Sequence, residues 1–197
     1  MADYPVTRAA AMELSDEQQL IRQGYDFLDE KRILLASETM RQLTAWKTLK
    51  ATYEDAMAKA RAALARALMQ HGLEELQVHP AVVAGPVQFD TVSRNFLGVP
   101  LVEIQLRADE GIPDAGKISK AEACGLAFRA LSRIAAEMAA VSGNLLRLAA
   151  EYRRTERRAR ALENVLLPEI SNALKMIEEQ LEATDLEEAV RVRRTTA

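Results

Sequence analysis

The sequence predicts an all-α protein in which two long helices pair as an antiparallel left-handed coiled coil, with a short β-hairpin inserted between them. Three observations predict this class. Apolar residues recur at seven-residue steps in the first and last thirds of the chain, aromatic residues make up only 5% of it, and most of the prolines lie in the middle third. Alanine and leucine, which favour helices, replace the aromatic volume of an ordinary globular core.

The first long helix is expected within residues 1–76. Residues 9–76 contain no proline and only two glycines, so little interrupts a helix there. Gln42 is the one break in its main apolar row. The residues placed on the coiled-coil seam are Leu14, Ile21, Leu28, Leu35, Trp46, Leu49 and Tyr53.

The second long helix is expected within residues 118–197. Ser119 and Glu122 have the spacing of a capping box at its start. Pro168 predicts a helix kink, because proline lacks a backbone N–H and crowds the carbonyl of Asn164; the apolar pattern shifts by one residue beyond it. The residues placed on the seam are Leu131, Met138, Leu145, Tyr152 and Leu166.

Residues 77–117 are interpreted as a connector with a small β-hairpin. Apolar and polar residues alternate over 87–91 and 101–106, and turn-forming residues occupy 95–100.

The two helices are expected to pair with each other, because a single amphipathic helix of this length cannot bury its own stripe. Aligning the heptads places Trp46 opposite Ala149 and Ala150, and Tyr53 opposite Ser142 and Gly143. Large residues then oppose small ones, as close packing requires.

Residues that carry catalytic chemistry are scarce. The two histidines, His71 and His79, lack the helical spacing of a metal site, and no phosphate-binding loop pattern occurs. We therefore expect no catalytic residue, cofactor or metal. The single cysteine, Cys124, excludes an internal disulfide and favours a reducing compartment. No apolar stretch approaches the length of a membrane span, and the start lacks the apolar segment of a signal peptide, so we expect no direct membrane insertion.

Several blocks of sequence, in order along nearly the whole chain, resemble one family. The most specific is TERRARALENVLLP at 155–168; Gly24-Tyr25 followed by Lys31-Arg32, NFLGVP at 95–100, and EEAVRVRR at 187–194 support it. The chain resembles the D subunit of the V-type and A-type rotary ATPases.

This resemblance implies a non-catalytic central rotor shaft that transmits torque between an ATP-hydrolysing or ATP-synthesising head and a membrane ring that translocates ions. The implied partners are the A and B subunits of the head, the small F subunit on the stalk, and the funnel-shaped C or d subunit at the ring. The implied location is cytoplasmic, peripheral to the membrane as part of a membrane-bound complex. The coupled ion and the direction of ATP turnover stay open.

A basic cluster in the matching segments is the candidate contact with the head. Its members are Lys31, Arg32, Arg157, Arg158 and Arg160. The alternative interpretation is a solvated charged face with pairs within one helix, such as Glu156 with Arg160.

Two other functions are compatible with a helical hairpin. One is an arm that binds nucleic acid, for which the basic run at 153–160 is the only support; the net charge of −3 weighs against it, so no nucleic-acid partner is expected. The other is a coiled-coil scaffold of an unrelated complex, which would be recognised by different co-purifying proteins.

Overall fold

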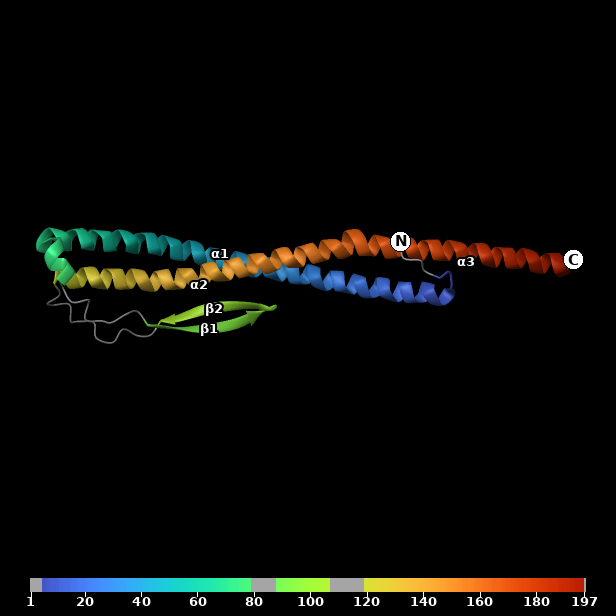
Figure 1. Cartoon of the computed structure of the whole chain (residues 1–197), viewed down its shortest axis with the longest axis horizontal. Helices are drawn as coiled ribbons and strands as arrows, with labels where there is room; N and C mark the ends of the chain where they lie inside the picture. Colours follow the sequence, from blue (N-terminus) through green and yellow to red (C-terminus); the bar gives the residue numbers. More distant parts are fainter. Residues whose placement is uncertain (1–4, 79–87, 107–118, 197) are drawn as a thin grey trace. The chain divides into compact units, whose positions relative to one another are not determined.

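The computed structural model describes residues 5–78, 88–106 and 119–196. Helix α1 (Arg8–Val78) precedes a hairpin of strands β1 (Phe89–Phe96) and β2 (Val99–Leu106) (Figure 1). Helices α2 (Lys120–Ala161) and α3 (Leu167–Thr196) follow, joined by the π-helical turn η1 (Leu162–Leu166). The predicted helical class with a hairpin between the helices is confirmed. Two parts of the expected connector, residues 79–87 (which include His79) and 107–117, lie outside the described residues.

The chain forms two packed units, Met1–Leu34 with Tyr152–Ala197, and Leu35–Glu151. In the first unit the start of α1 packs antiparallel to α3. Leu14 lies in a buried cluster with Ile170, Ala173 and Ile177. At the first residue of α1, Arg8 forms an exposed ion pair with Asp185 at 2.9 Å.

The region before Pro168 forms a π-helical turn, which explains the shift in the apolar pattern. The N–H of Leu167 donates to the carbonyl of Leu162, five residues earlier instead of four. A π-helical turn accommodates one extra residue and widens the helix beside the proline ring. As a result, Leu166, which the heptad pattern places on the seam, is 39% exposed, and burial resumes at Ile170.

In the second unit the rest of α1 packs antiparallel to α2. Ala63 and Ala67 lie in a buried cluster with Cys124, and Leu35 and Leu148 are completely buried. The small side chains of the cluster let the two helix backbones approach closely.

Trp46 shows that the predicted pairing of the helices is wrong by one heptad. Its indole N–H donates to the Ser142 hydroxyl at 3.0 Å, whereas the sequence pattern placed Ala149 opposite Trp46 and Ser142 opposite Tyr53. A shift of seven residues keeps apolar rows in contact, so the heptad pattern alone cannot distinguish the two pairings. A partly buried indole N–H is stabilised by an acceptor, which Ser142 supplies and an alanine side chain does not. A Cβ added at Gly143 would meet the guanidinium of Arg147, at 3.4 Å, and not the side chain of Tyr53.

Among the seam residues expected from the sequence, burial is uneven. Leu14, Leu35 and Leu131 are buried. The partly covered ones are Ile21, Leu28, Trp46, Leu49, Tyr53, Met138, Leu145 and Tyr152.

Local sequence signals account for the ends of the helices. The Ser119 hydroxyl accepts the N–H of Glu122 at 3.2 Å, while the Glu122 carboxylate accepts the N–H of Ser119 at 2.7 Å, so the predicted capping box is confirmed. Near the other end of α1, Gly72 interrupts the helix with φ of 70°, a backbone conformation that glycine adopts without a steric penalty.

The β-hairpin has a two-residue turn, shorter than the 95–100 segment expected from the sequence. Phe96 pairs with Val99 across the turn, and the strands are antiparallel and in register to Phe89 and Leu106. The two turn residues, Leu97 and Gly98, have φ of 51° and 88°, the pattern of a type I′ turn. Pro100 fits within β2 because it pairs with Asn95 at a position whose N–H points away from β1.

Replacing Leu97 with asparagine is expected to stabilise the hairpin by about 0.5–1 kcal/mol. Leucine is disfavoured at positive φ, whereas Asn-Gly is the preferred pair for a type I′ turn. Amide hydrogen exchange across the strands should slow by up to about fivefold. Gly98→Ala is the matched control and should have the opposite effect; faster exchange in both variants would contradict the turn assignment.

Candidate functional site

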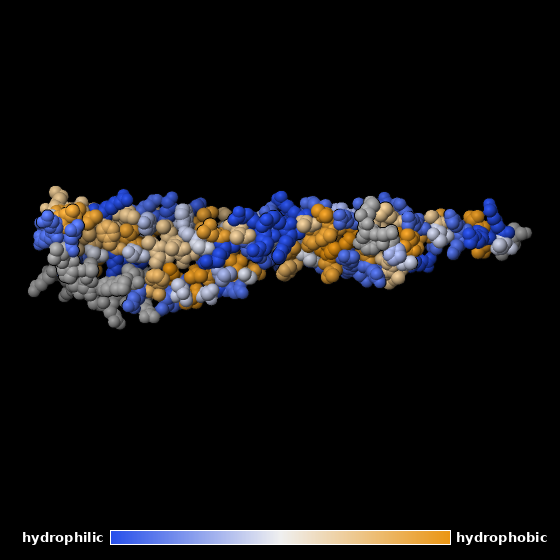
Figure 2. All heavy atoms as spheres, in the orientation of Figure 1, coloured by the Kyte–Doolittle hydropathy of each residue, from blue (hydrophilic) through white to orange (hydrophobic). Residues whose placement is uncertain are grey.

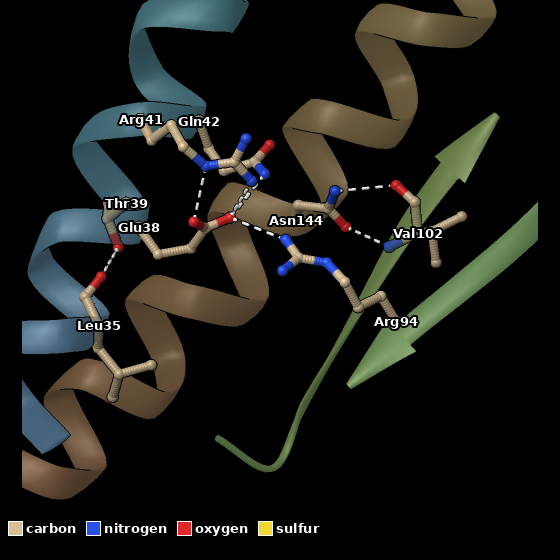
Figure 3. Close-up of polar contacts among 8 residues, drawn as sticks. All are labelled: Leu35, Glu38, Thr39, Arg41, Gln42, Arg94, Val102 and Asn144. Atoms are coloured by element: carbon tan, nitrogen blue, oxygen red, sulfur yellow. Dashed lines mark hydrogen bonds and ion pairs between the residues drawn. The ribbon is translucent and has the colours of Figure 1, made fainter. Parts of the chain in front are cut away.

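The hairpin-docking cluster, where β1 and β2 rest on α1 and α2, is a connected set of polar contacts between the hairpin and the helices. We define it by Glu38, Arg41, Gln42, Arg94, Val102 and Asn144 (Figure 3). Beside it, Val99 and Leu101 of β2 are buried at 3% and 1% exposure. β1 is exposed along nearly its whole length. The hairpin therefore rests on the helices through β2 and leaves β1 toward solvent.

The Asn144 side chain holds β2 by forming the pair of backbone hydrogen bonds that a neighbouring strand would form. Its side-chain oxygen accepts the N–H of Val102 at 2.8 Å, and its side-chain N–H donates to the Val102 carbonyl at 2.9 Å (Figure 3). Asn144 is 2% exposed, so these bonds form away from water. They satisfy the backbone groups on the outer edge of β2 that would otherwise be unpaired.

Glu38 forms the second polar attachment. Arg41 donates two bonds to its carboxylate at 2.6 and 2.7 Å, and Gln42 donates a third at 2.9 Å. Arg94 reaches the same carboxylate from β1, with Nη2 3.5 Å from Oε1 (Figure 3). Hydrogen bonds from Arg41 are the main reason that the pKa of Glu38 lies below its ordinary value, against the opposing effect of burial.

Replacing Glu38 with glutamine is expected to lower the free energy of unfolding by about 1–2 kcal/mol at pH 7, because charge-assisted bonds are replaced by neutral ones. The folded-state pKa of Glu38 is depressed, so its stabilisation is present above the unfolded-state value of about 4.5 and is lost as the pH falls through the folded-state pKa. The difference from the parent chain should therefore shrink as the pH falls below about 4.5 in urea titrations.

Glu54→Gln on the same helix is the matched control. Glu54 is 65% exposed, and its one ion pair within the described residues is an exposed pair with Lys50, so its substitution should change stability by less than about 0.5 kcal/mol. A Glu38→Gln effect that stays constant from pH 7 to pH 3 would contradict the assignment.

Sequence patterns alone did not reveal the hairpin-docking cluster. Gln42 was visible as the one polar residue in an apolar heptad row, and Glu38 lies one helical turn before it. These signals mark a buried polar pair on α1. Asn144 carries no such signal, because its role depends on where β2 docks.

The predicted basic cluster is partly engaged in local ion pairs. Arg32 pairs with Asp29 and Arg160 with Glu156, each within one helix. Two of the five cations thus have the helix-internal pairing that the alternative interpretation describes.

The other three cations of the basic cluster differ in exposure. Arg157 and Arg158 are exposed, and neither pairs with a carboxylate in the described part of the chain. Arg157 Nε donates to the carbonyl of Arg153 at 3.3 Å. Lys31 is partly buried. Arg157 and Arg158 therefore remain the members most open to a partner.

The segments that hold this cluster lie side by side within the first unit. The Cδ1 of Leu162 is 3.8 Å from the position that a Cβ on Gly24 would occupy. The Glu163 carboxylate, next to Leu162, is the main cause of the raised pKa of Tyr25. The matching region of α1 therefore faces the start of the π-helical turn.

Metal-binding and membrane-spanning features do not occur in the described part of the chain. No group of three or more histidine, cysteine or acidic side chains there is placed to hold a metal ion. None of the helices in those residues combines the length and apolar character needed to cross a bilayer.

Comparison with known proteins identifies the family. The sequence profile of the ATP synthase D subunit matches residues 10–197, which include both long helical runs and the hairpin. The chain belongs to the ATP synthase D-subunit family. The resemblance inferred from the 155–168 block is thereby confirmed.

Individual members of the D-subunit family match over similar lengths. The D subunit of the V-type ATP synthase of Thermotoga neapolitana is 27% identical over 191 residues, covering 95% of this chain and 94% of that protein. The D subunit of the A-type ATP synthase of Pyrococcus abyssi is 27% identical over 197 residues, covering 97% and 92%. The corresponding A-type protein of Methanopyrus kandleri is 28% identical, covering 98% of this chain and 86% of its own.

Proposed function

We propose that this chain is the non-catalytic central rotor shaft of a V/A-type rotary ATPase. The observation that carries the proposal is the D-subunit family match from residue 10 to residue 197, across both long helical runs. In the proposed role the chain transmits torque between the head, made of A and B subunits, and the ion-translocating ring in the membrane. The small F subunit binds its side, and the C or d subunit connects it to the ring.

The packing within each unit supports this role. Two helices packed along their lengths resist bending and twisting better than one, because each buried cluster ties α1 to a partner helix. The proposal places the chain at the cytoplasmic face, peripheral to the membrane. No ATP-binding or catalytic residue in this chain is part of the mechanism; the chemistry belongs to the head.

Co-expression of the chain with the A, B and F subunits tests the proposal. An affinity tag on this chain should retain all three together, and the retained complex should hydrolyse ATP. Retention of none of these subunits would contradict the proposal, and retention of a different set of proteins would favour the scaffold alternative. The hairpin and the adjoining part of α1 are the candidate surface for the F subunit.

Arg157 and Arg158 carry the proposed contact with acidic loops of the head, because both are exposed and neither is ion-paired in the described ranges. Reversing both charges with glutamate is expected to lower ATP turnover of the assembled complex by about tenfold, the effect of roughly 1.4 kcal/mol lost at the contact. Arg61→Glu, at an exposed position in the other unit, should change turnover less than twofold. Equal turnover in the two variants would contradict this contact.

A further inference from the structure

A line of exposed apolar residues runs along the start of α1, separate from its buried seam. Leu20 is 68% exposed, Phe27 65% and Leu34 43%. They are spaced by seven residues, so they stack on one face of the helix, about 10 Å apart. The seam of the same helix is covered instead, with Leu14 only 2% exposed. We call Leu20, Phe27 and Leu34 the outer stripe.

The outer stripe lies within the first unit, where Figure 2 shows apolar surface over the beginning of α1 and the start of α3. Single exposed leucines are common on protein surfaces and need no explanation. A heptad row of three large side chains is different, because it continues the geometry of a coiled coil on a face that no other described segment covers.

The charges beside the outer stripe indicate the chemistry of what covers it. Residues three, four or seven positions from Leu20 or Phe27 share its face. Lys31 is the single cation at these spacings. The carboxylates at these spacings are all exposed and form no ion pair in the described ranges: Glu13, Asp16, Glu17 and Glu30. A basic surface therefore complements this face, and a second copy of the chain, with the same acidic flank, is disfavoured.

We propose that the outer stripe is the docking site for an amphipathic helix of another subunit of the complex, with apolar residues at heptad spacing and lysine or arginine on its flanks. This inference rests on the proposed function, since it takes the partner from the same ATPase. A helix fits because apolar side chains at heptad spacing on one helix pack between the heptad-spaced side chains of a second helix along its length. The acidic flank sets the orientation of the partner helix and excludes acidic competitors.

Phe27→Glu tests the proposal in the assembled complex, with Met69→Glu as the matched control. Met69 lies on the same helix and is 89% exposed, but it is not part of the outer stripe. Both variants should keep the helicity and the melting temperature of the isolated chain, because both positions face solvent. In pull-downs from the co-expressed complex, Phe27→Glu should reduce retention of one subunit at least tenfold, and Met69→Glu should retain it as the parent does.

A charge variant tests the chemistry of the partner. Asp16→Lys combined with Glu30→Lys should weaken retention of that same subunit and reduce the salt dependence of its binding. Retention that is unaffected by this double variant would overturn the basic-flank assignment.

The outcomes separate this inference from the proposed function. If the parent chain retains no ATPase subunit, the rotor proposal fails. If the parent assembles and Phe27→Glu assembles equally well, only the docking site fails. A concentration-dependent dimer of the isolated parent chain that Phe27→Glu abolishes would also overturn it, by making a second copy the occupant.

Discussion

Replacing Leu148 with alanine is expected to lower the free energy of unfolding by about 2–5 kcal/mol, the largest effect that we expect from a single substitution in this chain. Leu148 is completely buried in the second unit. The substitution removes apolar contacts and leaves a cavity that two rigid helices could fill only by moving closer together. Urea unfolding followed by circular dichroism measures the loss.

Leu146→Ala is a close control, because Leu146 lies two residues away on α2 and is 72% exposed. Its substitution should cost less than about 0.5 kcal/mol, because leucine and alanine have similar helix propensities and little buried area is lost. Similar losses for Leu146→Ala and Leu148→Ala would mean that the seam of α2 is not where the structure places it.

Replacing Asn144 with alanine is expected to release the hairpin from the helices and to cost about 2–4 kcal/mol of hairpin docking. Two hydrogen bonds with Val102 are lost together, and the backbone groups of Val102 lose their partner in a mostly dry contact. Hydrogen exchange at the Val102 amide should accelerate by a factor of at least about 30, while exchange within α1 near Leu14 stays unchanged.

Asn144→Asp separates loss of the amide from loss of volume. Aspartate can still accept the Val102 N–H but cannot donate to the Val102 carbonyl. We expect the protection of the Val102 amide in Asn144→Asp to lie between its protection in the parent and its protection in Asn144→Ala. Ser132→Ala, at an exposed position on α2, should leave the Val102 amide protected. Unchanged exchange at Val102 in Asn144→Ala would show that the buried Val99 and Leu101 are sufficient to dock β2.

The sequence predicted the helices and the hairpin because those depend on local patterns. The heptad rows, the Ser119–Glu122 capping box and the glycine in the hairpin turn all act over a few residues. The one-residue shift of the apolar pattern near Pro168 was also visible, although the π-helical turn that produces it was not.

The pairing of the helices could not be predicted because it is a long-range property. Heptads repeat, so pairings one heptad apart bury nearly the same apolar area, and the hydrogen bond between Trp46 and Ser142 distinguishes them. The hairpin-docking cluster was missed for the same reason. Asn144 and Val102 are 42 residues apart, and nothing in either neighbourhood indicates their contact.

The candidate contacts with other subunits depend on which side chains are exposed and unpaired, and the sequence did not show this. It selected five cations without showing that Arg32 and Arg160 are paired within their own helices. The outer stripe was also missed, because only solvent exposure distinguishes Phe27 from a core residue such as Leu35.

Rotation of single assembled complexes would decide whether this chain is the rotor shaft. The head would be fixed to a surface through its A subunits, and a bead would be attached to this chain in the complex. We predict that the bead turns in one direction in steps when ATP is added and stops when ATP is removed. A bead that stays still while the same complexes hydrolyse ATP and retain the chain would contradict the assignment.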